Sequence, residues 1–119
     1  MIQLRVCRSD IAAELYKEAF GLDSIAGFGR YDDGTYKHAQ LNIYGQVIFL
    51  SELTDSEPVA GTTMQICIEL GKGREESVRN AYNILSDGAK IEHALGEPCW
   101  NPLLFSLVDK FGVNWCVYV

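Results

Sequence analysis

Long apolar runs are missing from this sequence. Its 119 residues contain no stretch near the roughly 18 apolar residues that a membrane-crossing helix needs. The first ten residues, MIQLRVCRSD, also lack the charged leader and apolar segment of a signal peptide. We therefore expect a cytoplasmic protein without a membrane partner.

Basic clusters are missing as well. Ten Lys and Arg residues stand against sixteen Asp and Glu residues, which leaves a net charge of −6. No cluster of Lys or Arg is longer than two residues, whereas a nucleic-acid-binding surface needs a concentrated positive footprint. The sequence therefore predicts no nucleic acid partner.

Closely spaced cysteine pairs are a third absence. The four cysteines, Cys7, Cys67, Cys99 and Cys116, form no CxxC pair. With no signal peptide to direct the chain to an oxidising compartment, we expect reduced thiols. Three of them lie in strand-like stretches (RVC, QICIEL and WCVYV), which predicts small buried core residues.

What the sequence does contain is a pattern of apolar residues that occurs twice. In the first half, helical spacing over 11–20 follows a strand, with Ser9 and Asp10 as the expected N-cap and Gly21 as the expected stop. The second predicted helix covers 74–86, after a loop at 53–61. The predicted strands are 2–7, 25–31, 36–44, 46–51, 62–70, 89–94, 103–108 and 113–119.

Each half therefore runs strand, helix, strand, strand, strand. One such unit is too small to bury both faces of its sheet, but two together can leave helices on one face and a hollow on the other. We predict an α+β fold in which two βαβββ modules form a curved mixed sheet with a concave cleft. The chain is expected to be a single domain, 1–119, with pseudo-repeats at about 1–52 and 62–119.

Four stretches carry a resemblance to a known family. They are AAELYKEAFG (12–21), HAQLNIYGQVIFLSE (38–52), SDGAKIE (86–92) and EPCWNPLLFSLVDKFGVNW (97–115). In order and spacing the chain resembles the vicinal oxygen chelate superfamily, which has the glyoxalase/bleomycin-resistance/dioxygenase fold, and is most similar to its PhnB-like branch. The resemblance covers nearly the whole chain.

Catalytic members of that superfamily hold a divalent metal with four His, Gln or Glu side chains on the first and last strands of each unit. The resemblance places these positions near Met1 or Gln3, at Phe49, near Thr63 and at Cys116. Phenylalanine cannot bind a metal and threonine is a poor ligand. The resemblance therefore implies that the metal quartet is missing, and no cofactor is predicted.

Strand alternation predicts which side chains face the hollow. Apolar Ala39, Leu41 and Ile43 are expected to face a helix, as are Met64, Ile66 and Ile68. The opposite face then carries polar and aromatic groups suited to a small organic ligand. The predicted ligand-binding residues are His38, Gln40, Asn42, Phe49, Gln65, Trp100, Asn114 and Tyr118.

Candidate catalytic residues are His38, Glu52 and Cys116. His38 fits a ligand-binding group, a general base or a metal donor, and equally a histidine that hydrogen-bonds a neighbouring strand or a dimer partner. Glu52 and Glu92 are the residues that would complete a divalent metal site with His38.

His93 is expected to be exposed, and Trp100 is either a wall over the hollow or a plug at the core edge.

Three functions remain open at this point. The first is a small-molecule binding protein of the bleomycin-resistance kind, which needs no metal. The second is a metal- or thiol-dependent lyase or transferase-type enzyme of the same superfamily, and the third is a self-association or protein-interaction domain. The resemblance also implies a homodimer, and the final strand WCVYV suits a sheet edge or an interface.

Overall fold

The computed structural model describes residues 1–96 and 103–119. Within it the chain divides into two compact units, Met1–Val59 and Ala60–Val119. The division falls inside the loop predicted between the two repeats. That the two units together make one domain remains a prediction.

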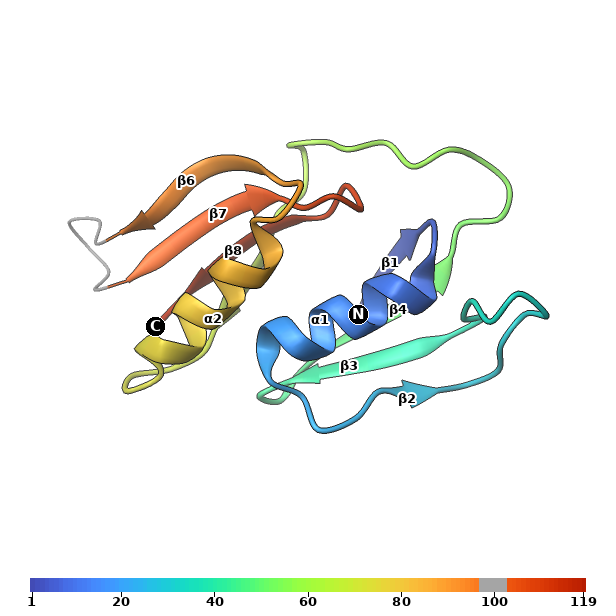
Figure 1. Cartoon of the computed structure of the whole chain (residues 1–119), viewed down its shortest axis with the longest axis horizontal. Coiled ribbons are helices and arrows are strands. Elements are labelled where there is room, and N and C mark those ends of the chain that lie inside the picture. The colour runs from blue at the N-terminus through green and yellow to red at the C-terminus, as the bar shows by residue number, and fades with distance from the viewer. Residues whose placement is uncertain (97–102) are drawn as a thin grey trace. The chain divides into compact units, whose positions relative to one another are not determined.

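The first unit contains β1 (Ile2–Val6), α1 (Ser9–Phe20), β2 (Ala26–Gly27), β3 (Ala39–Ile43) and β4 (Gln46–Glu52). Its sheet has the strand order β1-β4-β3-β2, in which β1 and β4 are parallel and the other pairs are antiparallel. Helix α1 lies across one face of this sheet (Figure 1).

The second unit repeats this arrangement. It contains β5 (Ile66–Glu69), α2 (Glu75–Leu85), β6 (Lys90–Gly96), β7 (Leu104–Val108) and β8 (Asn114–Tyr118). Its strand order is β5-β8-β7-β6, again with the first and last strands of the unit parallel, and α2 lies across one face (Figure 1). The predicted α+β class and the two βαβββ modules are confirmed, each module with a four-stranded mixed sheet of its own.

Each helix buries an apolar stripe against its sheet, as the spacing of the sequence predicts. The buried helix residues are Ala12, Ala13, Tyr16, Ala19 and Phe20 in α1, and Val78, Ala81 and Leu85 in α2. The strand residues under them include Ala39, Leu41, Ile43 and Leu50 in the first unit, and Phe105, Leu107, Trp115 and Val117 in the second. These clusters form one apolar core in each unit.

Helix α1 ends as predicted but begins differently. Gly21 has a left-handed φ of 63°, and its N–H is directed to the carbonyls of Lys17 and Glu18. At the other end Arg8 is the N-cap, with a φ of 61° and no capping hydrogen bond from its side chain. The predicted Ser9 cap is wrong because the Ser9 hydroxyl accepts the N–H of Tyr36 instead, at 2.8 Å.

Three predicted strands are clearly shorter than expected. The stretch 36–44 is a strand only over β3, Ala39–Ile43. The stretch 25–31 contributes only β2 and a bridge between Arg30 and Tyr36, because Gly29 has a φ of 96° that interrupts the ladder. The stretch 62–70 contributes only Ile66–Glu69, the length over which it pairs with β8. Met64 therefore lies before the strand and is 73% exposed, not under the helix as predicted.

The prediction of buried core cysteines is also wrong. Cys67 is exposed and Cys7 and Cys116 are partly exposed, all three with free thiols. Strand alternation explains the two in the second unit, because their neighbours Ile66, Ile68 and Trp115 take the helix side. Cys99 lies outside the described residues.

In the described part of the chain, no helix is long and apolar enough to cross a membrane.

A buried carboxylate organises the turn between β7 and β8. Asp109 accepts hydrogen bonds from the backbone N–H of Phe111 at 2.8 Å and of Val113 at 3.0 Å. Its second oxygen accepts the indole N–H of Trp115 at 2.8 Å. One side chain therefore fixes the turn and the largest residue of the second core.

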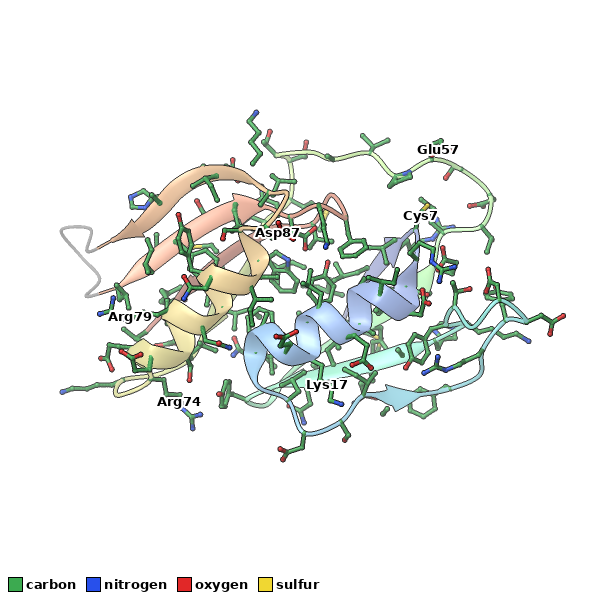
Figure 2. The ribbon with its side chains drawn as sticks, viewed as in Figure 1. Cys7, Lys17, Glu57, Arg74, Arg79 and Asp87 are labelled. Atoms are coloured by element: carbon green, nitrogen blue, oxygen red, sulfur yellow. The ribbon has the colours of Figure 1, made fainter. Side chains whose placement is uncertain are left out.

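Replacing this carboxylate should destabilise the chain. In the Asp109→Ala variant three donors lose their acceptor, and we expect the free energy of unfolding to fall by about 3 kcal/mol, measured by urea denaturation. Asp87→Ala is the matched control, since Asp87 follows α2 with an 83% exposed side chain (Figure 2) and should leave stability unchanged. Equal stability of the two variants would contradict the role of Asp109.

Candidate functional site

Each sheet has one face that its helix does not cover. Register and alternation place side chains from β1, β3 and β4 on the first of these faces, and side chains from β5, β7 and β8 on the second. We call them the first open face (Gln3, Gln40, Asn42, Val47, Phe49 and Ser51) and the second open face (Cys67, Glu69, Ser106, Asn114, Cys116 and Tyr118).

Phe49 lies at the centre of the first open face. It is the register partner of Gln3 on β1 and of Gln40 on β3, so an aromatic ring stands between two amide side chains. The ring is partly exposed, and Gln3 Nε2 donates a hydrogen bond to Ser51 Oγ at 2.8 Å. The row combines an apolar surface with amide donors and acceptors, which is the composition of a small-molecule contact surface.

The other two predicted residues of this unit have different surroundings. Asn42 is exposed, and its Oδ1 accepts the N–H of Gly45 at 2.7 Å, so it supports the turn between β3 and β4. His38 is exposed and directly precedes β3, where its backbone carbonyl accepts the N–H of Phe28 at 2.8 Å. Of the predicted residues in the first unit, Gln40 and Phe49 are therefore the two that lie together.

Glu52 has a structural contact at the start of α1. Its two carboxylate oxygens accept the backbone N–H groups of Arg8 at 2.9 Å and Ser9 at 2.8 Å. It therefore supplies from β4 the cap that no residue of the helix provides, and the positive end of the helix dipole favours its charge. Glu52 shares the parity of buried Leu50, which faces α1, so the structure does not bring it to His38 on the opposite parity.

This capping role predicts a loss of stability when the carboxylate is removed. We expect Glu52→Ala to lower the free energy of unfolding by about 1–2 kcal/mol, and Glu52→Gln by less, because an amide keeps one acceptor oxygen. Urea denaturation measures both. Asp55→Ala, which removes an exposed ion pair with Arg5, is the control and should have no measurable effect. Wild-type stability of Glu52→Ala would refute the cap.

Two thiols lie next to each other on the second open face. Cys67 on β5 is the register partner of Cys116 on β8, and Ser106 on β7 flanks Cys116 on its other side. Burial raises the pKa of Cys116 to about 11, with further contributions from the charge of Cys67 and a hydrogen bond with it. At neutral pH Cys116 is therefore a protonated thiol and a weak nucleophile, which argues against thiol catalysis by this residue.

The remaining predicted residues of the second unit lie on the same face. Gln65 Nε2, just before β5, donates a hydrogen bond to Oδ1 of the buried Asn114 at 3.1 Å. Tyr118 is partly exposed beside Glu69, its register partner. Burial first, and then the charge of Glu69, raise the pKa of Tyr118, so it is a neutral phenol at physiological pH. Trp100 lies outside the described residues.

The metal positions that the resemblance implies can be compared with the register. In each unit the first and last strands are parallel neighbours, and they pair Gln3 with Phe49 and Cys67 with Cys116. The expected Thr63 position is wrong, because β5 begins only at Ile66 and Cys67 stands opposite Cys116. One amide, one aromatic ring and two thiols do not fit the His, Gln or Glu quartet of the superfamily.

No other metal-binding cluster replaces it in the described ranges. Over residues 1–96 and 103–119 no group of three or more His, Cys, Asp or Glu side chains is placed to hold a metal ion. Glu92 and His93 are both exposed on β6, as expected for His93.

The second unit also has a shallow pocket of about 310 Å³ beside the turn that Asp109 organises. Its lining includes Thr62, Lys90, Val108 and Lys110, and Lys110 forms a long ion pair of 3.8 Å with Asp87. None of the predicted ligand-binding residues lines this pocket, so we place the candidate site on the open faces.

Comparison with known proteins supports the fold. No family model matches the sequence, and no curated protein does. Among solved structures, the chain is similar to protein PA1353 of Pseudomonas aeruginosa, with a TM-score of 0.78 and 18% identity over 98% of this chain and 92% of the other. It is also similar to the PhnB protein of Bacillus cereus, with a TM-score of 0.73 and 21% identity over 99% and 96%.

A third similar structure is a glyoxalase/bleomycin resistance protein of Albidiferax ferrireducens T118. Its TM-score is 0.70 and its identity 13%, over 98% of this chain and 93% of the other. The chain thus has the glyoxalase/bleomycin-resistance fold, and a PhnB protein is among the structures to which it is similar. The resemblance seen in the sequence is confirmed at the level of the fold.

Proposed function

We propose that this chain binds a small organic molecule on the first open face, without the metal quartet of its superfamily. The observation that carries the proposal is the partly exposed Phe49 ring between the side chains of Gln3 and Gln40. An aromatic ring contributes a large apolar contact area, and the flanking amides add directional donors and acceptors. This pairing suits a flat or aromatic ligand with polar substituents.

The second open face supports a related role for its own polar groups. The hydrogen-bonded pair of Gln65 and Asn114 and the neutral phenol of Tyr118 offer further donors and acceptors to a ligand. The alternative of a metal- or thiol-dependent enzyme has less support. Glu52 is bonded to the start of α1, and Cys116 has a pKa of about 11. Binding is therefore favoured over catalysis.

A ligand screen with matched variants tests the proposal. We expect a compound from a panel of small aromatic and thiol compounds to raise the melting temperature of the wild-type protein, because a ligand of the native state stabilises it. Calorimetric affinity for that compound should fall at least about tenfold in Phe49→Ala, the cost of a lost aromatic contact. Ile11→Ala, which removes a 49% exposed apolar side chain of α1, on the helix side of the sheet, should bind as the wild type does.

The outcome against the proposal is equally definite. Wild-type affinity in a folded Phe49→Ala protein would show that the ligand does not bind on the first open face. Since Phe49 is only partly buried, the variant should fold, and its own melting curve verifies this.

We also propose that the chain is a homodimer. The last strand is expected at a sheet edge or an interface, and the first alternative is wrong, since β8 pairs with both β5 and β7. The edges of the second sheet are β5 and β6, and five of the seven residues of β6 are exposed. An uncovered edge strand presents unpaired backbone groups to a second chain.

Light scattering tests the dimer directly. The expected mass is twice the 13.3 kDa of one chain, at protein concentrations well above the dissociation constant. A mass of 13.3 kDa across the accessible concentration range would contradict it.

A further inference from the structure

The two adjacent thiols of the second open face have a spacing that permits a covalent bond. Cys67 and Cys116 are directly paired across the parallel strands β5 and β8. Neighbouring strands lie roughly 4.8 Å apart, and disulfides join residues whose Cα atoms are about 4.4–6.8 Å apart. Register partners on neighbouring strands point to the same side of the sheet, so the two thiols share the second open face.

The two cysteines differ in accessibility. Cys67 is exposed, whereas Cys116 is partly buried between Cys67 and Ser106. Strand β5 has four residues and stands at the edge of its sheet, paired with β8 alone. A reagent can therefore reach Cys67 before Cys116, and β5 is held in its sheet through β8 alone.

We propose that Cys67 and Cys116 form a reversible oxidation site that alternates between a dithiol and a cross-strand disulfide. The oxidant belongs to the class of small disulfides, of which oxidised glutathione is the probe. The proposal does not depend on the ligand of the first open face.

The exchange takes two steps. First, the sulfur of Cys67 loses its proton and attacks the small disulfide, so that a mixed disulfide forms and one small thiol leaves. Second, Cys116 loses its proton and attacks the sulfur of Cys67, which expels the second small thiol. Cys116 is a weak nucleophile because little of it is deprotonated at neutral pH, but the strand register holds it next to the sulfur that it attacks. The two protons end on the two small thiols. The protein has then lost two protons and two electrons, and the small disulfide has gained them.

The bond would change the second unit in two ways. It would remove both thiol groups as hydrogen-bond donors on the second open face. It would also close a loop of about 50 residues that contains α2, β6 and β7, which restricts the unfolded chain and raises the melting temperature.

The experiment treats the full chain with oxidised glutathione, quenches it by alkylation and maps it by non-reducing mass spectrometry. We expect two of the four cysteines to be lost as thiols, no glutathione to be retained, and Cys67 and Cys116 to be found in one linked peptide pair. The oxidised protein should melt several degrees higher, and dithiothreitol should reverse the change.

Serine variants separate the two roles. Cys116→Ser should retain one glutathione on Cys67, because the second step has no attacking thiol. Cys67→Ser should leave Cys116 unmodified. Cys7→Ser is the matched control, since Cys7 lies in the first unit just after β1 (Figure 2), and it should oxidise as the wild type does. Each serine differs from cysteine by one atom, and melting curves of the reduced variants verify folding.

Three results would overturn the proposal. One is a wild-type protein that keeps all four thiols, and another is a wild-type protein that accumulates the mixed disulfide on Cys67. The third is a disulfide that joins either residue to Cys7, to Cys99 or to a second chain.

Discussion

One helix covers one face of each four-stranded sheet, and the rest of the molecule follows from this constraint. Successive residues of a strand point to opposite faces, so the helix side takes the apolar residues and the other side takes what remains. In β3 and β4 this rule buries Leu41 and Leu50 completely. It leaves Gln40 and Phe49 on the uncovered side, where a molecule from solution can meet them.

A second constraint is the parallel pairing of the first and last strands in each unit. A helix between strands lets a later strand return parallel to the first, so residues far apart in the sequence become neighbours. In both units the second register pair of the parallel strands holds the side chains of interest: Gln3 with Phe49, and Cys67 with Cys116. The second register pair of the parallel strands thus carries an amide and an aromatic ring in the first unit and two thiols in the second.

The limits of sequence reasoning follow from these two constraints. Periodicity predicts both helices and the parity of β3, β4 and β8, because a local pattern determines which side chains share a face. It cannot predict the register between distant strands, so Thr63 is expected at the position opposite Cys116 that Cys67 occupies. It also misses where β5 begins, so Met64 is expected under the helix although it is exposed. The local Ser9 cap likewise fails because the Ser9 hydroxyl accepts the N–H of Tyr36, and a carboxylate from β4, Glu52, accepts the N–H groups at the start of the helix.

The same contacts determine which chemistry the chain has to offer. Asp109 accepts three hydrogen bonds that hold a turn and a tryptophan, and Glu52 accepts two at the start of a helix. A carboxylate bonded in this way is held in place as an acceptor for the groups around it. The open faces are left with amides, a phenylalanine, a neutral phenol, thiols and the carboxylate of Glu69 as their main functional groups. Such groups suit recognition of a ligand by shape and hydrogen bonding, as we propose for the first open face, and the thiol pair is the place of the proposed oxidation.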